Sequence, residues 1–215
     1  MSERRTTRAI VLAAGMGSRL GDEGAPPKPL RAVSGVPLLV RVLRTLQSVG
    51  IREAVVITGH DGDRIRRALL VEPSLGLELS FVHNPRYQLK NGVSLLSAAP
   101  FVDRECLLTM SDHLYSPDLV RQLLAYELAP GACALGVDFD IERCFDIDDA
   151  TKVRVDGNRI GDIAKDLGSY EAIDTGVFRI GPALMRELEL LEARQGDCSR
   201  IRAGPMRNTP VSMAS

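Results

Sequence analysis

Long hydrophobic runs are missing from this sequence. Only the six apolar residues 9–14 precede Gly15, and no later run approaches the length of a membrane span. A signal peptide needs a longer apolar core, and a spanning helix needs about 20 apolar residues. We therefore expect a cytoplasmic protein with no membrane segment in this chain.

An excess of charge of either sign is also missing. The sequence has 27 basic and 28 acidic residues and a formal net charge of -1. Proteins that bind nucleic acids or anionic membranes depend on excess positive charge. Basic residues do cluster at 4–8 and 64–67, and we interpret these clusters as a solvated terminus and a helix face. We therefore expect no nucleic-acid partner.

Cysteine pairs at metal-binding or redox spacing are absent. The four cysteines are Cys106, Cys133, Cys144 and Cys198, and none of them forms a Cys-x-x-Cys motif. Two of them sit in apolar, strand-like runs, which is typical of reduced thiols in a core. We expect neither a disulfide framework nor a metal site built from cysteine.

The pattern that is present is an alternation of apolar, strand-like runs with helical segments. The 215 residues are 45% hydrophobic, enough for a single domain around one core. We expect strands near 10–12, 54–58, 77–82, 106–110, 132–137, 152–155, 160–164 and 171–180, and helices near 37–49, 61–71, 91–99, 117–128 and 182–195. The predicted fold is α/β, a doubly wound, mixed but mainly parallel Rossmann-like sheet. Ligands in such sheets bind beyond the carboxyl ends of the strands.

The most informative stretch is residues 9–30, AIVLAAGMGSRLGDEGAPPKPL. Its apolar strand ends in a loop where Gly15 and Gly17 let the backbone turn tightly and present bare N–H groups to an anion. A P-loop would need Gly-Lys-Ser/Thr at the end of the loop, and a dinucleotide fingerprint would need a third glycine where this chain has Leu20. Neither of these two phosphate loops is present.

Two cations accompany this loop. Arg19 can donate a fork of hydrogen bonds to phosphate oxygens. Lys28 adds a point charge between Pro27 and Pro29, which stiffen the segment and exclude it from a helix. Glycines and cations together favour a nucleotide phosphate site over an ordinary strand-to-helix turn.

A second candidate site residue is Asp112, the second residue after the strand 106–110. A carboxylate at this position can hold Mg²⁺, which neutralises charge on phosphate oxygens. The alternative interpretation is a helix cap before Pro117. His113 is interpreted as a shape or substrate contact at best.

These motifs resemble the signature of nucleotidyltransferases that join an NTP to a sugar phosphate or polyol phosphate, in which LAAGxGxRL precedes KPL. The chain carries this signature at residues 12–20 and 28–30. Further matches at 91–94, 111–116, 150–153, 165–167 and 174–176 are most similar to the CTP:inositol-1-phosphate cytidylyltransferases. The resemblance covers about residues 8–195. It implies transfer of a cytidylyl group from CTP to inositol 1-phosphate, with release of pyrophosphate and with Mg²⁺ as cofactor.

The resemblance also implies a role for each matching residue. Leu12, Ala13, Ala14, Gly15, Gly17, Asn91 and Ser94 would bind the nucleotide, Lys28 and Arg19 would be catalytic cations, Asp112 would hold the metal, and Lys165 and Asp174 would bind the phosphorylated polyol. The segment around Asn91 is equally compatible with an ordinary helix N-terminus.

The C-terminus departs from the family pattern. Relatives end in a Trp-x-Asp-Val-Asp-like motif that supplies a second Mg²⁺ carboxylate, whereas residues 196–215 contain no tryptophan and no carboxylate after Asp197. We expect a nucleotidyltransferase domain over residues 1–195, incomplete at its C-terminal end, and a flexible or altered tail over 196–215. An inactive nucleotide-binding homologue is therefore a second hypothesis.

Two further points stay open at this level. The same chemistry with phosphocholine or a sugar 1-phosphate as acceptor is compatible with the sequence. In the family the domain is often fused to a membrane-embedded transferase that uses CDP-inositol, so a membrane CDP-alcohol transferase is an expected partner.

Overall fold

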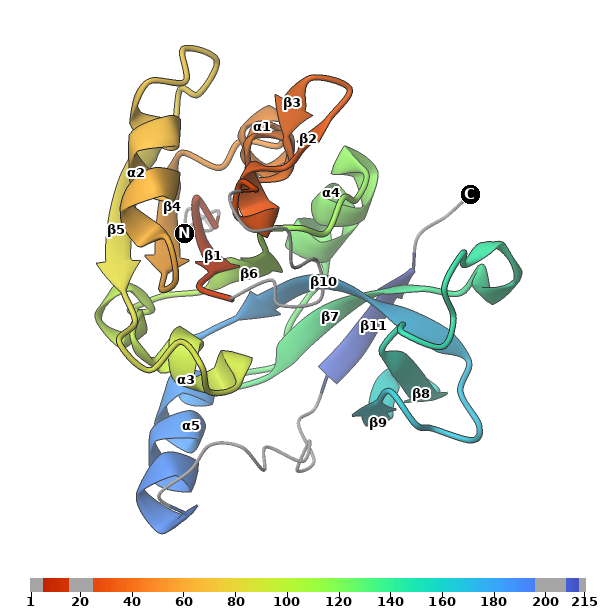
Figure 1. Ribbon diagram of the computed structural model, residues 1–215. Helices are drawn as coiled ribbons and strands as arrows, with labels where there is room; N and C mark the ends of the chain where they lie inside the picture. Colours follow the sequence, from red (N-terminus) through yellow and green to blue (C-terminus); the bar gives the residue numbers. More distant parts are fainter. Residues whose placement is uncertain (1–5, 16–24, 196–207, 213–215) are drawn as a thin grey trace.

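The computed structural model describes residues 6–15, 25–195 and 208–212. The strands of its main sheet are β1 (Arg8–Ala13), β4 (Glu53–Thr58), β5 (Glu78–His83), β6 (Cys106–Met110), β7 (Cys133–Asp138), β8 (Lys152–Asp156), β9 (Arg159–Ala164), β10 (Ala172–Ile180) and β11 (Asn208–Ser212). Within the described residues these nine strands follow the order β11-β7-β10-β6-β1-β4-β5, and β8 and β9 branch from β10 (Figure 1). A separate small hairpin joins β2 (Ala32–Val33) to β3 (Val36–Pro37).

The centre of the sheet is parallel. Strand β1 pairs in parallel with β4 on one side and β6 on the other, and β5 continues beyond β4 in the same direction. Strand β10 is antiparallel to both β6 and β7. The expected α/β fold with a mixed Rossmann-like sheet is confirmed.

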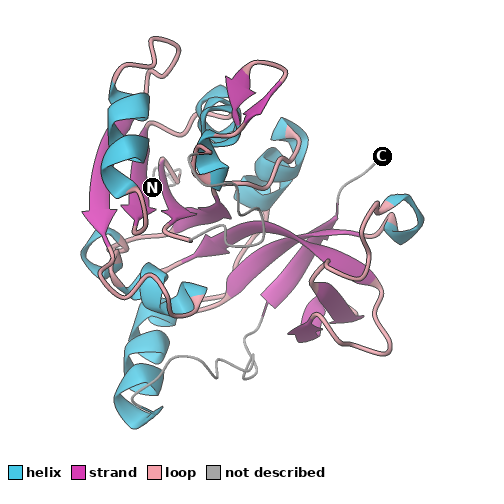
Figure 2. Ribbon diagram, in the orientation of Figure 1, coloured by secondary structure: helices cyan, strands magenta, loops and turns pink. Residues whose placement is uncertain are grey.

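Helices cover both faces of this sheet, as Figure 2 shows. They are α1 (Leu38–Ser48), α2 (Gly62–Leu70), α3 (Asn91–Leu96), α4 (Pro117–Ala125) and α5 (Pro182–Gln195). Alternate residues of β1 point to opposite faces: Val11 packs in the core beneath α1, α2 and α4, whereas Leu12 packs beneath α3 and α5. A parallel strand buried on both faces has to be apolar throughout, which explains the unbroken run of β1.

The β8–β9 hairpin extends the sheet beyond β10. Gly157 forms its turn with φ of +56°, a conformation that glycine adopts without strain. Val153 and Ile160 pack against Leu135 and Val137 of β7 in a small core of their own. The hairpin thereby brings the end of β9, and Lys165 just beyond it, to the carboxyl edge of the central strands.

The C-terminal segment contains a strand that the sequence did not predict. Strand β11 lies beside β7 in parallel, with Thr209 opposite Ala134. Five residues of the segment expected to be a flexible or altered tail therefore form a strand. An edge strand offers unpaired backbone groups that accept almost any extended segment, so no distinctive side-chain pattern announces such pairing. The remainder of 196–215 lies outside the described residues, and the domain limit 1–195 stays a prediction.

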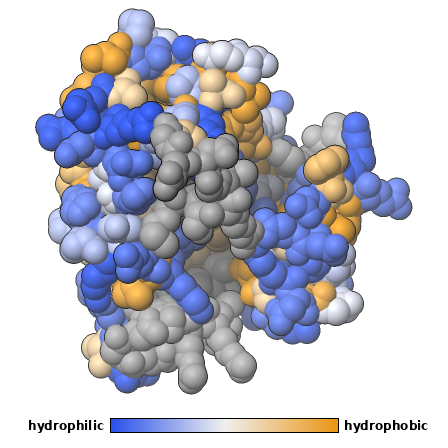
Figure 3. Space-filling model, viewed as in Figure 1, coloured by the Kyte–Doolittle hydropathy of each residue, from blue (hydrophilic) through white to orange (hydrophobic). Residues whose placement is uncertain are grey.

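Polar surface predominates outside the core. On the face shown in Figure 3, hydrophobic residues form separate groups among hydrophilic ones. No helix in the described ranges is long and apolar enough to cross a bilayer. Cys106, Cys133 and Cys144 are free thiols, and burial raises the pKa of Cys106 to about 12.

The start of α4 agrees with the sequence prediction in detail. Ser116 is the N-cap, and its hydroxyl oxygen accepts a hydrogen bond from the Leu119 backbone N–H at 3.2 Å. Pro117 occupies the first turn, where its missing N–H costs nothing.

Ser116→Ala should therefore lower the free energy of unfolding by about 1 kcal/mol. The variant loses the acceptor for an N–H at the start of α4, while nothing in the core changes. Chemical denaturation measures the difference, and Ser116→Asp serves as the control because it keeps a capping oxygen. Equal losses in both variants would show that the cap contributes nothing.

Candidate functional site

A cavity of about 700 Å³, called here the main cavity, lies at the carboxyl ends of β1 and β6. Because β10 runs antiparallel to β6, its first residues reach the same edge of the sheet. The main cavity brings together most of the predicted site residues that the structure describes: Leu12, Ala14, Gly15, Lys28, Asn91, Ser94, Asp112, Lys165 and Asp174 line it. Residues that are far apart in the sequence thus meet at one place.

Three predicted residues do not appear in this lining. Gly17 and Arg19 lie outside the described residues. Ala13 is only 1% exposed and packs in the core beneath α1, α2 and α4, on the opposite face from Leu12. The alternation of β1 turns the Ala13 side chain away from the cavity, so any contact with a nucleotide would have to come from its backbone.

Lys28 and Asp112 form an ion pair across the main cavity, with 2.5 Å between Nζ and Oδ2. Lys28 belongs to a single 3₁₀ turn, Lys28–Leu30. The expectation that Pro27 and Pro29 exclude this segment from any helix is therefore wrong for one turn. Proline is tolerated in a first helical turn, where its N–H would be unpaired anyway.

Hydrogen bonds control the charge of Asp112. Burial alone would raise the pKa of this carboxyl, but hydrogen bonds from His113 and Lys28 outweigh burial and hold the pKa well below its usual range. Asp112 is therefore a carboxylate at neutral pH. It does not cap α4, because Ser116 does so, and the helix-cap interpretation is wrong.

His113 is wedged between Asp112 and β10. Its Nδ1 lies 3.2 Å from Oδ1 of Asp112, and this hydrogen bond raises the pKa of His113 above its ordinary value. Gly176 has φ of +76°, and a Cβ there would lie 2.9 Å from the imidazole ring. The glycine thus leaves the room that His113 fills.

Buried polar groups support the side of the cavity formed by α3. Asn84 is 1% exposed and donates a hydrogen bond from Nδ2 to the Ser94 hydroxyl oxygen at 2.9 Å. The Oδ1 of Asn84 accepts from the Arg86 backbone N–H. Ser94 is thereby held with its own hydroxyl hydrogen still available for donation. Asn91, the first residue of α3, lies beside Met110 with 3.8 Å between Nδ2 and Sδ.

The opposite side of the cavity carries two lysines with different surroundings. The Lys165 ammonium pairs with Oδ1 of Asp149 at 2.6 Å. Lys152 is 8% exposed, and its ammonium donates to the Lys165 backbone carbonyl at 2.7 Å, 5.7 Å from the ring centre of Tyr170. The buried lysine therefore fixes the backbone from which Lys165 projects.

Asp174 lies on β10 at this side of the cavity. Its Oδ1 accepts a hydrogen bond from the Gly176 backbone N–H at 2.7 Å, and burial raises the pKa of the carboxyl. One oxygen of the carboxyl is held by the strand, and the other is available to a ligand.

Further polar residues of the site were not predicted from the sequence. Asp146 and Asp149 line the cavity, and Asn84 holds Ser94 from behind. The acidic residues around Asp149 can be seen in the sequence. Their position beside Lys165, however, depends on the β8–β9 hairpin, which brings the two segments together. A buried asparagine such as Asn84 leaves no comparable trace in a single sequence.

In this doubly wound sheet, a lysine and an ionised aspartate meet beyond the carboxyl end of the first strand. This arrangement is typical of a nucleotide-dependent transferase. Residues 9–145 match the MobA-like NTP transferase domain. The chain belongs to this family of nucleotidyltransferases.

Curated relatives extend well beyond this domain. The chain is 38% identical over 204 residues to the bifunctional IPC transferase and DIPP synthase of Rubrobacter xylanophilus, covering 92% of this chain and 44% of that protein. The protein of the same name from Archaeoglobus fulgidus is 34% identical over 189 residues, covering 87% of this chain and 36% of its own length. This chain thus spans less than half the length of these relatives.

A solved structure agrees with the fold over nearly the whole chain. The inositol-1-phosphate CTP transferase from T. maritima matches with a TM-score of 0.81 at 25% identity. The match covers 97% of this chain and 86% of that one. It supports the assignment of the mixed sheet to the nucleotidyltransferase fold.

The pairing of Asp112 with His113 predicts an effect of pH. Because the folded-state pKa of His113 is raised, its stabilising contribution is complete at low pH and disappears as the pH rises through that pKa. The lowered pKa of Asp112 acts in the opposite sense: its contribution is present above the unfolded pKa and is lost as the pH falls.

Asp112→Asn should therefore lower the pKa of His113, measured by NMR titration of the imidazole protons. His60 and His83 provide reference signals, and Asp118→Asn, an exposed change on α4, is the matched control. A His113 titration that does not move in Asp112→Asn would contradict the assigned hydrogen bond.

Proposed function

We propose that this chain transfers a cytidylyl group from CTP to inositol 1-phosphate, giving CDP-inositol and pyrophosphate. The observation that carries the proposal is the meeting of Lys28, Asp112 and Lys165 in one cavity. A triphosphate needs cations at one end of such a cavity, and a phosphorylated acceptor needs a cation at the other. The inositol-1-phosphate CTP transferase of T. maritima and the bifunctional relatives support the choice of substrates.

The reaction is a direct displacement at the α-phosphorus of CTP. The acceptor phosphate oxygen forms the new P–O bond as the bond to the leaving pyrophosphate breaks, so a covalent enzyme intermediate is not required. Lys28 stabilises the negative charge that builds up on the transferring phosphate. Arg19, outside the described residues, is a second predicted cation for this role.

Mg²⁺ is the cofactor that we propose. Asp112 fits it because its carboxylate is ionised, lines the cavity and offers the oxygen donors that Mg²⁺ prefers. The described residues contain no cluster of three or more His, Cys, Asp or Glu side chains, so the triphosphate and water would supply the remaining ligands. Bound there, the ion would neutralise charge on the phosphates.

The acceptor would be held by Lys165 and Asp174. Lys165 can exchange Asp149 for the phosphate of the acceptor, since both partners are anions, while Lys152 keeps its backbone fixed. Asp174 is unsuited to a phosphate because two anions repel each other. It is suited to accepting hydrogen bonds from ring hydroxyls of a polyol.

We further propose that the product serves phospholipid precursor synthesis in the cytoplasm and is consumed by a membrane CDP-alcohol transferase. The names of the bifunctional relatives support a coupled second step. This proposal does not depend on whether the second activity belongs to the same polypeptide.

Lys28→Ala should reduce turnover by about 10²- to 10³-fold, equivalent to about 2.7 to 4 kcal/mol of lost transition-state stabilisation. Release of pyrophosphate is measured with each of the four NTPs against inositol 1-phosphate, phosphocholine and a sugar 1-phosphate. Lys28→Arg keeps the positive charge, so its turnover should fall less than that of Lys28→Ala. Wild-type protein that binds CTP but releases no pyrophosphate with any acceptor would instead identify an inactive nucleotide-binding homologue.

Changes on the acceptor side should separate phosphate binding from polyol binding. Lys165→Ala should raise the KM for every phosphorylated acceptor and leave the KM for CTP unchanged, because the lost ammonium contacts phosphate alone. Asp174→Asn should reduce the use of inositol 1-phosphate as a substrate more than the use of phosphocholine, because phosphocholine has no ring hydroxyls. If Asp174→Asn lowers the use of both acceptors equally, or if phosphocholine is the better substrate of the wild type, the inositol assignment is wrong.

A further inference from the structure

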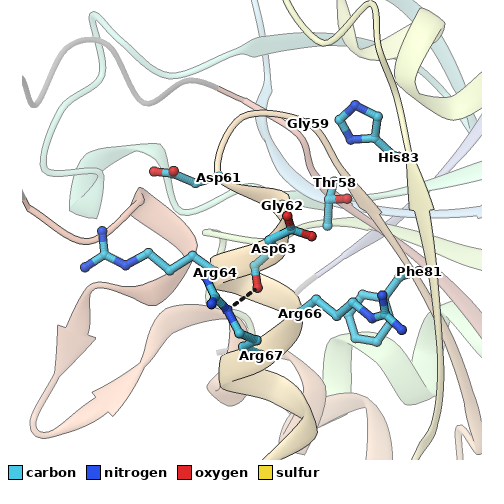
Figure 4. Close-up of a pocket in the computed structure, with 10 residues that line it drawn as sticks. All are labelled: Thr58, Gly59, Asp61, Gly62, Asp63, Arg64, Arg66, Arg67, Phe81 and His83. Atoms are coloured by element: carbon cyan, nitrogen blue, oxygen red, sulfur yellow. Dashed lines mark hydrogen bonds between the residues drawn. The ribbon is translucent and has the colours of Figure 1, made fainter.

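A second cavity, of about 630 Å³, lies beside α2 at the carboxyl ends of β4 and β5 (Figure 4). Three exposed arginines of α2, Arg64, Arg66 and Arg67, line it, and we call it the arginine cavity. These are the basic residues that the sequence suggested to be a solvated helix face. Arg66 lies over the ring of Phe81, 5.8 Å from its centre, so the cavity has an aromatic wall as well.

The three arginines have no carboxylate partner among the described residues. Arg64 donates to the Ala25 carbonyl at 3.4 Å, and Arg67 donates to the Asp63 carbonyl of its own helix at 3.3 Å. Backbone carbonyls do not neutralise a guanidinium. Asp61 and Asp63 also line the cavity, so its side chains carry three positive and two negative charges. The excess charge is positive, and the guanidinium forks remain available to an anion.

The arginine cavity adjoins the main cavity. Gly59 lies between them: a Cβ at this position would be 2.2 Å from Cβ of Tyr87 and 2.8 Å from the carbonyl oxygen of Ala14. Both of these residues line the main cavity, whereas Gly59 lines the arginine cavity. In addition, α2 contacts the 3₁₀ turn that carries Lys28. Gly59 therefore lies where the arginine cavity approaches the main cavity.

We propose that the arginine cavity binds the phosphate anion of this reaction, either free pyrophosphate or the distal phosphates of the bound nucleotide. Guanidinium groups match phosphate oxygens in geometry and charge. In Figure 4 the three side chains extend from α2 in different directions, with Arg64 and Arg66 on opposite sides, so their donors are distributed over a wide surface. The identity of the anion rests on the proposed function, because that reaction would release pyrophosphate in the neighbouring main cavity.

Calorimetric titration with pyrophosphate tests the proposal. The protein is titrated alone and again with saturating CTP in the absence of an acceptor, so that no turnover occurs. Wild type should bind pyrophosphate while CTP fills the main cavity. Arg64→Gln/Arg67→Gln should weaken this binding by about tenfold or more. Both residues are exposed, so thermal unfolding should be unchanged.

The same titrations include a control variant and distinguish free pyrophosphate from the distal phosphates of bound CTP. Arg186→Gln/Arg194→Gln removes the same charge from exposed positions of α5 and should leave pyrophosphate binding unchanged. A second outcome is that CTP abolishes pyrophosphate binding and that Arg64→Gln/Arg67→Gln binds CTP more weakly than the wild type but binds CMP equally well. The arginine cavity then holds the distal phosphates of the nucleotide, which also supports the proposal. An α2 variant that binds pyrophosphate and CTP like the wild type overturns it. In the titration without CTP, pyrophosphate binding is measured when no cytidylyl transfer can occur. Its outcome therefore does not depend on whether the protein forms CDP-inositol.

Discussion

The parallel register between β1 and β6 is the constraint on which the site depends. Leu12 lies opposite Met110, and the Ser111 backbone N–H donates to the Leu12 carbonyl at 3.0 Å. This ladder ends both strands at the same level. Asp112 therefore emerges beside the start of the glycine-rich loop, within reach of Lys28. A shift of one residue would turn every side chain of β1 to the other face and separate these groups.

Ion pairs within the chain occupy the two lysines among the described residues that line the main cavity. Lys28 pairs with Asp112, and Lys165 pairs with Asp149. A phosphate can replace a carboxylate at a lysine with little change in the charge that the lysine experiences, so a substrate would exchange one anion for another. This arrangement keeps both lysines paired before substrates arrive. Because both lysines are exposed, these ion pairs contribute little to stability and can be exchanged readily for a substrate phosphate.

The main elements of the fold follow from local patterns. Apolar periodicity predicted the helices and the buried strands, and the Ser116-Pro117 pair predicted the start of α4, because these signals arise within a few residues of each other. Strand β11 was not predicted. Its pairing depends on the backbone of β7, which is remote in the sequence and available only after the sheet has formed.

The sequence by itself predicted the glycine-rich loop, Lys28 and Asp112 as site residues, because glycines, a lysine and a carboxylate at strand ends suit a nucleotide phosphate. Lys165 was predicted only through the family resemblance. Only the tertiary structure decided which groups meet. The sheet alternation turns Ala13 into the core, and the β8–β9 hairpin sets Asp149 against Lys165. At Gly59 the arginine cavity approaches the main cavity. Such contacts depend on chain crossings between distant segments, and a local pattern of residues carries no record of them.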